Sequence, residues 1–381
     1  RDYYASRGLG DVYKRQEFVM KSNAETSKSN KKSKGYGMKI AMAAGLGTLL
    51  VCGIVAIGLI AFSDLFSIKP AASPSREYNY NDPYGGLKPD KNNSKEKSLK
   101  VQYLGDVLYA GGQAVPDSFE VILEREDGST ERVTDYESVV LDDSFRLTEG
   151  TNTIEFTYDG LKASVDVNAV NVRNLPYPPN YVLRSVDITA ARQKVDGLNN
   201  GTLSFADAFS NMSFTGDSQI RALATNGIIS EEYIVARNGE SYDFFNDNMD
   251  SVITMASGKD AVIVHYGINT LSTSAEERSN RINQYKDLLL RLKSACPDTR
   301  IIVSGVFPVC YTIFGSQQRF EYINDYDFEL CEMCMEIGVE YLSDNAYMME
   351  HQDVFGSDGL HLTKEFYTGY WLKNLVTTMG L

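Results

Sequence analysis

The chain has 381 residues, which is more than one ordinary domain needs and suits two or three folded units. Its formal net charge is −14 at pH 7, which argues against a general binder of nucleic acids or of anionic membrane surfaces. Five cysteines are too few for a scaffold held together by disulfides.

The first 39 residues are predicted to be unfolded. The stretch 1–18 fits no structural element and has the character of a translated upstream leader, so we expect the native chain to start at Met20. From residue 21 to residue 39, six lysines accompany a single acid, Glu25, and little apolar material is present. Such a composition cannot bury enough surface to fold alone. Residues 1–39 are therefore expected to be a non-native leader followed by a basic cytoplasmic tail.

An uncharged run at residues 40–62 is long enough to cross a bilayer as a helix. The lysines before it should stay in the cytoplasm, which would put the rest of the chain outside the cell membrane. A cleaved signal peptide is the alternative, but the run is longer than a usual signal core and no small-x-small cleavage site follows closely. Cys52 hints at a lipoprotein, although Leu50 and Val51 are poor lipobox residues. We expect an uncleaved anchor followed by a flexible linker at residues 63–98, rich in Ser, Pro, Asn, Lys and Gly.

Residues 99–170 have a period-two pattern of short β-rich runs separated by turn signals such as Asp127-Gly128 and Asp159-Gly160. This pattern predicts a small β-sandwich. It resembles the bacterial immunoglobulin-like modules of cell-surface proteins, which usually act as spacers, and carbohydrate binding has no specific support. The predicted strands are 100–104, 118–123, 131–134, 153–158 and 163–167.

A proline-rich connector at 171–186 leads into residues 187–381, where apolar strand-like runs alternate with helical stretches. In the stretch 279–295, apolar residues recur at helical spacing. Alternating strands and helices predict an α/β domain with a parallel sheet covered on both faces. The predicted strands are 212–214, 232–236, 261–265, 300–306 and 340–342, and the predicted helices include 279–295 and 319–337.

Ser218 is the first candidate reactive residue, in the segment Phe-Thr-Gly-Asp-Ser-Gln at 214–219. A predicted strand ends there, Gly216 permits a tight turn, and a helix is expected to begin near Ser218. The hydroxyl would then lie where open α/β sheets bind ligands, beside backbone N–H groups that can stabilise an oxyanion. Taken alone, Gly-Asp-Ser is also a common turn or helix cap.

The second candidate segment, 357–362, contains Asp358 and His361. Serine needs a base to become a useful nucleophile, and histidine is the usual base near neutral pH. An aspartate three residues earlier can orient the imidazole and stabilise its cationic form. A solvated turn before the C-terminal helix is the alternative, but the chain has only three histidines, so few bases are available.

Two further segments follow predicted strands and offer hydrogen-bond donors. Gly239 could present a bare backbone N–H, and the side-chain amide of Asn269 could point at the same sheet edge. Together with the N–H of Ser218 they would make three donors for a tetrahedral oxyanion. Each alone reads equally well as a turn glycine or a capping asparagine.

The four segments, taken in chain order, resemble the four blocks of the SGNH, or GDSL-like, esterase and lipase family. The blocks are Gly216-Asp217-Ser218, Gly239, Gly267-x-Asn269 and Asp358-x-x-His361. The resemblance covers residues 187–381. It implies a flavodoxin-like three-layer α/β sandwich around a parallel sheet, a covalent acyl-enzyme on serine, and neither metal nor cofactor.

Carried over block by block, the resemblance implies Ser218 as nucleophile, His361 as general base and acid, and Asp358 as the residue that orients His361. It also implies an oxyanion hole made by Ser218, Gly239 and Asn269. The sequence departs from the family pattern twice.

The first departure is Gln219, which stands where the family often has leucine, and the second is Thr270, which replaces the aspartate after the block-three asparagine. Thr270 can still hydrogen-bond locally. Both departures bear on substrate choice more than on catalysis.

The remaining histidines and cysteines have plainer interpretations. A buried structural role suits His265 better than a ligand role, whereas His351, with Asp353, fits either the mouth of the site or the surface. Cys331-x-x-Cys334 falls on a predicted helix, where buried thiols are the default and an extracytoplasmic location would permit a disulfide. No second pair accompanies it at zinc spacing, so we expect no metal site.

Three aromatic residues leave two interpretations open. Tyr311, Phe314 and Tyr322 could form the wall of an acyl or sugar pocket, and core packing explains them equally well.

The sequence thus predicts a membrane-anchored extracytoplasmic serine esterase that removes small acyl groups, O-acetyl groups foremost, from carbohydrate. One alternative is an O-acyltransferase acting on cell-surface glycans, which would need a multispanning partner to supply acyl donors. Another is a catalytically inert surface-binding protein. The expected partners are an acyl ester or acetylated polysaccharide and the membrane through residues 40–62, with no nucleic acid.

Overall fold

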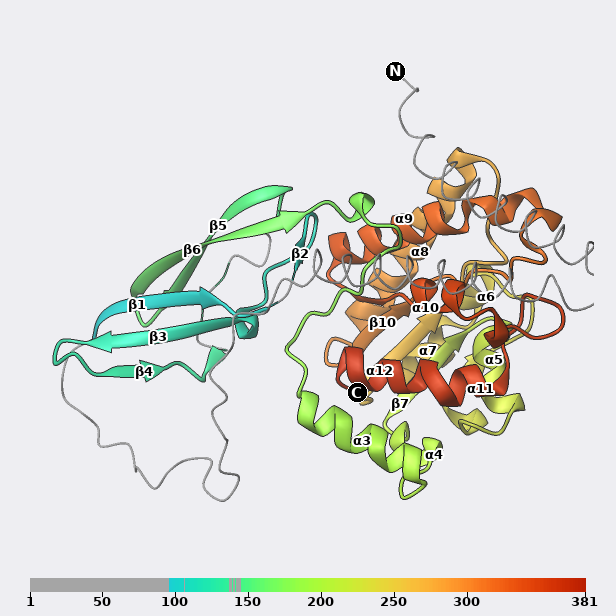
Figure 1. Cartoon of the computed structure of the whole chain (residues 1–381), viewed down its shortest axis with the longest axis horizontal. Coiled ribbons are helices and arrows are strands. Elements are labelled where there is room, and N and C mark those ends of the chain that lie inside the picture. The colour runs from blue at the N-terminus through green and yellow to red at the C-terminus, as the bar shows by residue number, and fades with distance from the viewer. Residues whose placement is uncertain (1–95, 106, 137–138, 140, 142–144) are drawn as a thin grey trace, which may run out of the picture. The chain divides into compact units, whose positions relative to one another are not determined.

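The computed structural model describes residues 96–381, except residues 106, 137–138, 140 and 142–144 (Figure 1). The predicted cytoplasmic tail, the predicted anchor at 40–62 and nearly all of the predicted linker lie outside these residues. Within the described part, no helix combines the length and the apolar character needed to cross a membrane.

The N-terminal strands form two three-stranded sheets. One sheet has the order β1-β3-β4 and is antiparallel; the other has the order β2-β6-β5, with β2 parallel and β5 antiparallel to β6. The bounds are β1 Glu96–Tyr103, β2 Leu108–Tyr109, β3 Phe119–Arg125, β4 Thr130–Arg132, β5 Gly150–Tyr158 and β6 Leu161–Val170.

The side chains of β3 show how the two sheets pack face to face. Its side chains alternate between buried and half-buried, so Phe119, Val121 and Leu123 point inward, as a period-two pattern requires. The ring of Phe119 meets Phe156 of β5, in the other sheet, with centroids 4.8 Å apart. One apolar core shared by two sheets makes a small β-sandwich. Its kinship with immunoglobulin-like modules stays a prediction.

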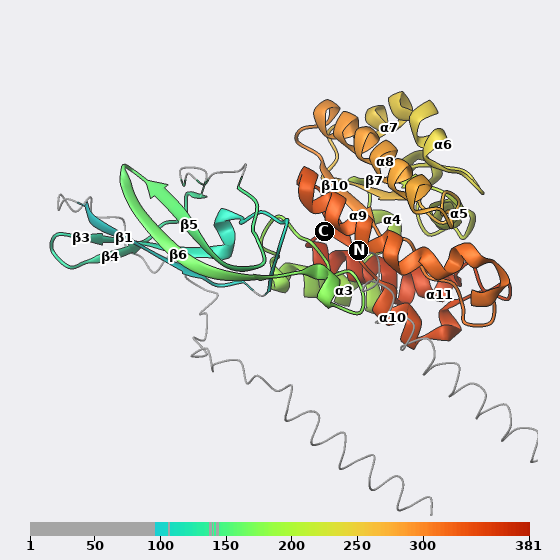
Figure 2. The same cartoon turned by 90° about the horizontal axis from the view of Figure 1, so that it is seen from above.

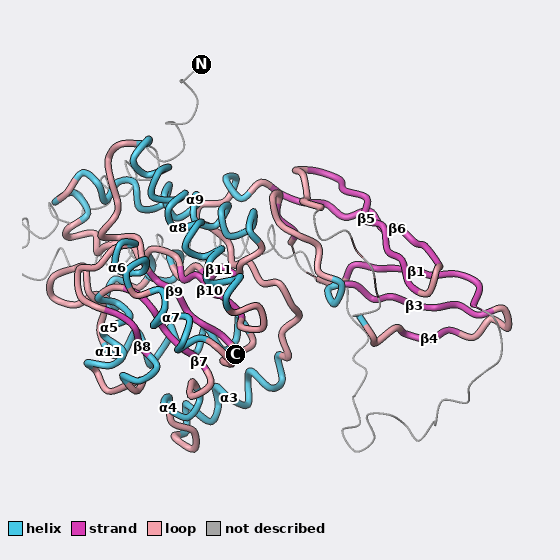
Figure 3. Tube along the Cα trace, turned by 180° about the vertical axis from the view of Figure 1, so that it is seen from behind, coloured by secondary structure: helices cyan, strands magenta, loops and turns pink. Residues whose placement is uncertain are grey.

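The C-terminal part is built on a five-stranded parallel sheet with the order β11-β10-β9-β7-β8 (Figure 3). This is the flavodoxin-like order, in which the strand order reverses between β7 and β9. Ligands bind at such a switch point, outside the carboxyl ends of the strands. The bounds are β7 Met212–Gly216, β8 Ile234–Ala236, β9 Ala261–His265, β10 Arg300–Ser304 and β11 Glu340–Leu342.

Helices cover both faces of this sheet (Figure 2). In β9, Val262 and Val264 belong to the core under one helical layer, and Ala261 and Ile263 belong to the core under the other. Strands that are buried on both faces read as continuous apolar runs, which is why β9 is buried throughout. The predicted three-layer α/β fold with a parallel sheet is confirmed.

The two helical layers differ in their position along the chain. The first comprises α6 Tyr242–Asp247, α7 Met249–Ala256, α8 Ala275–Ala295 and α9 Ile323–Ile337. The second comprises α3 Ile188–Asn200, α4 Phe205–Ala208, α5 Ser218–Thr225, α10 Asn345–Glu350, α11 Lys364–Phe366, the π-helix η8 Tyr367–Trp371 and α12 Leu372–Met379.

Three predicted elements of the C-terminal part are shorter than expected. The strand predicted at 300–306 is β10, which ends at Ser304. The strand predicted at 232–236 is β8 alone, because the preceding 3-10 turn η4 Glu231–Tyr233 occupies its first half. The helix predicted at 319–337 begins as the 3-10 turn η6 Gln318–Tyr322, and α9 follows at Ile323. Apolar runs predict these segments, but they do not distinguish a 3-10 turn from the element it joins.

Candidate active site

Ser218 is the first residue of α5, directly after the end of β7. The turn is tight: a Cβ on Gly216 would lie 2.3 Å from Cγ1 of Ile220 and 2.5 Å from the carbonyl oxygen of His265. Only glycine therefore fits at this position without a shift of the backbone. Asp217 caps the helix, since its Oδ1 accepts a hydrogen bond from the N–H of Gln219 at 3.0 Å.

The Asp217 carboxyl is fully buried, and burial raises its pKa to about 7. The hydrogen bond from the Gln219 N–H and the nearby His361 act in the opposite direction. The carboxyl of Asp217 therefore goes from neutral to ionised as pH rises through about 7, and it lies directly beside the predicted nucleophile.

Asp358 and His361 share one tight turn. Oδ1 of Asp358 accepts hydrogen bonds from the backbone N–H groups of Leu360 and His361, both at 2.9 Å, and Gly359 takes a φ of +71°. Gly359 is suited to this left-handed conformation, which most other residues avoid. The turn leaves Oδ2 of Asp358 2.7 Å from Nδ1 of His361.

The other imidazole nitrogen completes the arrangement. Nε2 of His361 lies 3.0 Å from Oγ of Ser218, although the two residues are 143 positions apart in the chain. An ionised carboxylate only accepts hydrogen bonds, so Nδ1 carries the proton toward Asp358 and Nε2 is left to accept the serine proton. The structure therefore brings together all three residues of the predicted triad, and their geometry suits proton transfer.

The ionisation of Asp358 suits this arrangement. Its partial burial would raise the pKa, but the hydrogen bonds from the His361 side chain and from the Leu360 and His361 N–H groups outweigh that effect and lower the pKa to about 2. The carboxylate stays charged across the physiological range. The site is open: the side chains of His361 and Asp358 are 48% and 52% exposed.

Two of the three predicted oxyanion donors are free. Among the described residues, none accepts a hydrogen bond from the backbone N–H of Ser218 or of Gly239. Gly239 lies in the turn after β8 with a φ of +76°. Asn269 differs, because its Nδ2 donates to the carbonyl oxygen of Glu240 at 2.9 Å and lies 3.4 Å from Oδ2 of Asp217. The second contact is longer than a normal hydrogen bond, so one N–H of the amide can turn toward a ligand.

The two departures from the family pattern have different outcomes. Thr270 makes the predicted local hydrogen bonds, from its backbone N–H and its Oγ1 to the carbonyl oxygen of Gly267. Gln219 is buried and donates from Nε2 to the carbonyl oxygen of Leu360. The sequence predicted that Gln219 bears on substrate choice more than on catalysis, because only tertiary structure reveals which carbonyl it reaches.

The other two histidines take no part in the site. His265 is buried, as predicted, and burial lowers its pKa to about 3 despite a hydrogen bond with Ser304, so it stays neutral. His351 is exposed, stacks on Tyr347 with centroids 4.0 Å apart, and pairs through Nδ1 with that residue's carbonyl oxygen. Asp353 is also exposed, which favours the surface interpretation of this pair.

Cys331 and Cys334 are buried free thiols, and burial raises the pKa of both. The permitted disulfide is not formed. Among the described residues, no group of three or more His, Cys, Asp or Glu side chains is arranged to hold a metal ion.

Two of the three aromatic candidates, Phe314 and Tyr322, pack against the core under α8 and α9. Arg278 lies over the Tyr322 ring at 4.2 Å, and the Tyr311 hydroxyl donates to the carbonyl oxygen of Met349. These contacts favour packing over a pocket wall.

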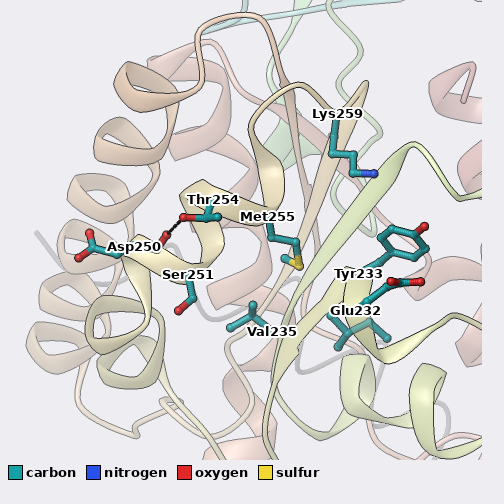
Figure 4. Close-up of a pocket in the computed structure, with 9 residues that line it drawn as sticks. Glu232, Tyr233, Val235, Asp250, Ser251, Thr254, Met255 and Lys259 are labelled. Atoms are coloured by element: carbon teal, nitrogen blue, oxygen red, sulfur yellow. Dashed lines mark hydrogen bonds between the residues drawn. The ribbon is translucent and has the colours of Figure 1, made fainter.

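A surface hollow of about 610 Å³ lies between β8 and α7 (Figure 4). None of the three triad residues lines it. Lys259 lies over the ring of Tyr233 at 4.7 Å and donates to the carbonyl oxygen of Ser210, so both its charge and the ring face are engaged. Ser251 lines the hollow, but no histidine does, and the hollow therefore lacks the base that a serine nucleophile needs.

Comparisons with known proteins concern the same region. Residues 204–368 match the sequence model of the GDSL-like Lipase/Acylhydrolase family. No curated protein is significantly similar in sequence. Similar solved structures include a GDSL-like lipase from Bacteroides thetaiotaomicron, with 15% identity, a TM-score of 0.35 and coverage of 50% of this chain and 97% of that chain.

Two further solved structures belong to the same group of matches. The lipase/acylhydrolase from Enterococcus faecalis has 13% identity and a TM-score of 0.32, covering 43% of this chain and 94% of its own. The acetyl xylan esterase AlAXEase has 13% identity and a TM-score of 0.34, covering 44% of this chain and 98% of its own.

Proposed function

We propose that this chain, whose residues 204–368 form a domain of the GDSL-like lipase/acylhydrolase family, is a serine esterase that removes small acyl groups through Ser218, His361 and Asp358. A hydrolase that acts on esters is what the family match supports. The observation that carries the residue assignment is the 3.0 Å approach of His361 Nε2 to the Ser218 hydroxyl, with Asp358 on the opposite nitrogen.

In the first half-reaction, His361 Nε2 takes the proton of the Ser218 hydroxyl as Oγ bonds to the ester carbonyl carbon. The electron pair of the carbonyl moves to its oxygen, which the N–H groups of Ser218 and Gly239 and one N–H of Asn269 stabilise. His361 then gives its proton to the departing alcohol oxygen as the C–O bond breaks, and an acyl group remains on Ser218.

In the second half-reaction, water takes the place of the alcohol. His361 removes a proton from the water as its oxygen attacks the acyl carbon, and then returns the proton to Ser218 Oγ as the acid leaves. Asp358 holds the imidazole in one tautomer throughout and stabilises its transient positive charge.

The openness of the site supports a small acyl group on a large substrate. His361 and Asp358 are about half exposed, and no triad residue lines the hollow between β8 and α7. A long acyl chain needs an apolar cavity that removes it from water, whereas an acetyl ester on a polysaccharide needs only access to the hydroxyl. We therefore propose O-acetyl esters of carbohydrate as the substrate class.

The proposed location follows from the sequence outside the described residues. An uncharged run at 40–62 after a lysine-rich segment supports a single-pass anchor with the catalytic domain outside the cytoplasm. An extracytoplasmic location suits an enzyme that acts on cell-wall or environmental glycans.

The test is hydrolysis of p-nitrophenyl acetate by the full chain and by Ser218→Ala. The variant should lose about a thousandfold or more in kcat, since the nucleophile is removed. Ser251→Ala, on the hollow of Figure 4, is the matched control and should keep full activity. Equal rates for wild type and Ser218→Ala would refute the proposal, and acyl transfer to an acetylated glycan's free hydroxyls in place of hydrolysis would favour a transferase.

A further inference from the structure

The Gln219 side chain connects the two segments that carry the proposed triad. Gln219 follows the nucleophile on α5, and Leu360 precedes His361 in the sequence. Nε2 of Gln219 donates to the carbonyl oxygen of Leu360 at 3.0 Å, across 141 positions of the chain. One side-chain amide thus ties the helix that presents Ser218 to the turn that presents His361.

A second residue fixes which way this amide points. The hydroxyl of Tyr367, in the π-helix η8, donates to Oε1 of Gln219 at 2.8 Å. Because Oε1 can only accept and Nε2 can only donate, the tyrosine holds the NH₂ group toward Leu360. π-helices are rare and often occur at functional sites.

Burying the polar side chain of Gln219 costs free energy that an apolar side chain at this position would not cost. Gln219 is 3% exposed and Tyr367 is fully buried. Removing an amide from water destabilises the folded protein unless its polar atoms form hydrogen bonds. An apolar side chain of similar volume would fill the same space on α5, next to the buried Ile220 and Leu223, with no such requirement.

Other contacts hold the turn to different parts of the fold. The N–H of Cys310 donates to the carbonyl oxygen of Gly359 at 2.8 Å, which attaches the turn to the segment after β10. The N–H of Gly356 donates to the carbonyl oxygen of His361 at 2.7 Å, within the turn itself. Lys364 Nζ donates to the carbonyl oxygen of Asn226 at the C-terminal end of α5, whereas the Gln219 amide acts at the N-terminal end of α5, next to Ser218.

We propose that Gln219 is a positioning residue, which holds the imidazole of His361 at hydrogen-bond distance from Ser218, with Tyr367 orienting its amide. This inference rests on the proposed esterase function. Without the amide, the turn that carries His361 loses its hydrogen bond from Gln219 on α5. A displacement of about 1 Å between reacting groups costs on the order of a hundredfold in rate.

The main experiment compares the full chain with Gln219→Leu, which restores the apolar residue common in the family and keeps the volume. We expect kcat for p-nitrophenyl acetate to fall about ten- to a hundredfold while KM changes far less, because an interaction that aligns the reacting groups is lost. Thr299→Val is the matched control, since its hydroxyl makes a buried hydrogen bond to the carbonyl oxygen of Ala256. Thr299 directly precedes β10, at the amino ends of the parallel strands, whereas Ser218 follows the carboxyl end of β7. This control should keep kcat within twofold.

A second variant, Gln219→Glu, should change the pH dependence of kcat, which a change in packing alone would not alter. A protonated carboxyl can still donate to the Leu360 carbonyl oxygen, whereas an ionised one repels it. The ratio of kcat for Gln219→Glu to kcat for wild type should therefore fall as pH rises. The corresponding ratio for Gln219→Leu should not depend on pH.

The outcomes separate this inference from the proposed function. If wild type hydrolyses the ester and Ser218→Ala does not, the esterase stands, and a folded Gln219→Leu with kcat within twofold of wild type would overturn the positioning role alone. If no ester is hydrolysed, crystal structures of wild type, Thr299→Val and Gln219→Leu still test the positioning role through the distance between His361 Nε2 and Ser218 Oγ. That distance should stay at hydrogen-bond length in wild type and Thr299→Val and lengthen in Gln219→Leu, and an unchanged distance in Gln219→Leu would contradict the inference.

Discussion

Asp217 and Ser218 are adjacent in the chain, yet the carboxyl of Asp217 is fully buried while the side chain of Ser218 reaches solvent. The turn between β7 and α5 separates them: Asp217 has the extended backbone of a helix cap, and Ser218 is the first helical residue. One side chain therefore points back into the protein to satisfy the helix N terminus, and the next points out toward His361.

Asp358→Asn should lower kcat by about a thousandfold or more with little loss of stability, because an amide at this position no longer enforces the required imidazole tautomer. Steady-state hydrolysis of p-nitrophenyl acetate checks the rate, and thermal unfolding checks the fold. Asp353→Asn, on the nearby 3-10 turn η7 Gln352–Val354, is the control and should behave as wild type. Equal activity in the two variants would remove Asp358 from the mechanism.

Asn269→Ala should lower kcat about a hundred- to a thousandfold, the usual cost of removing one oxyanion donor. KM should change little, because the interaction strengthens only as the carbonyl oxygen gains charge. Asn248→Ala is a suitable control, since Asn248 also donates from Nδ2 to a backbone carbonyl, that of Phe244. If Asn269→Ala kept its kcat, the bond to Glu240 would be the whole role of Asn269, and Ser218 and Gly239 alone would hold the oxyanion.

Gly216→Ala should destabilise the protein by roughly 1–3 kcal/mol, as expected for a methyl group forced into a packed site. The new Cβ would meet the backbone carbonyl of His265 at 2.5 Å, and that backbone cannot move without shifting β9. Activity should fall with stability, because β7 and α5 must separate. Gly369→Ala, where nothing lies within 4 Å of an added Cβ, is the control in chemical denaturation. Equal midpoints for the two variants would contradict the clash.

The buried carboxyls of Asp217, Asp327 and Asp344 should make the protein less stable as pH rises from about 4 to about 7. Burial raises the pKa of each to about 7 from the ordinary value of 3.8, so folding favours the protonated forms. Their stabilising contribution is complete below the unfolded-state pKa and is lost as pH rises through about 7. Each group changes the free energy of unfolding by up to about 1.4 kcal/mol per pH unit in this window.

Asp344→Asn isolates one of these groups. Oδ1 of Asp344 accepts a hydrogen bond from Nδ2 of Asn374, and hydrogen bonding from Asn374, Tyr370 and Trp371 lowers the pKa of the carboxyl against the larger effect of burial. An asparagine keeps the Oδ1 acceptor and removes the titrating group. The variant should flatten the dependence of unfolding free energy on pH, measured by urea denaturation from pH 4 to pH 8. The exposed substitution Asp250→Asn is the control, and an identical slope in Asp344→Asn and wild type would show that Asp344 does not titrate as described.

Local patterns in the sequence predicted the secondary structure and the local chemistry. Apolar runs and helical spacing predicted β9 and α8, because side-chain periodicity reports directly on which faces are buried. The pairing of Asp358 with His361 was also predictable, since two residues three positions apart can meet across one turn. The alternation of strands and helices predicted a parallel sheet, because each helix connects two neighbouring strands that run in the same direction, and the strand, helix and next strand follow one another in the chain.

Which distant groups meet depends on the fold as a whole. The approach of His361 to Ser218, the donation of Asn269 to Glu240 and the bond of Gln219 to Leu360 depend on sheet order and on the packing of α5 against the C-terminal helices. A local pattern contains no information on these, because a side chain's partner far along the chain is set by the fold as a whole. The motif therefore identifies Gln219 only as a departure from the family pattern, whereas the fold places its amide between the two halves of the site.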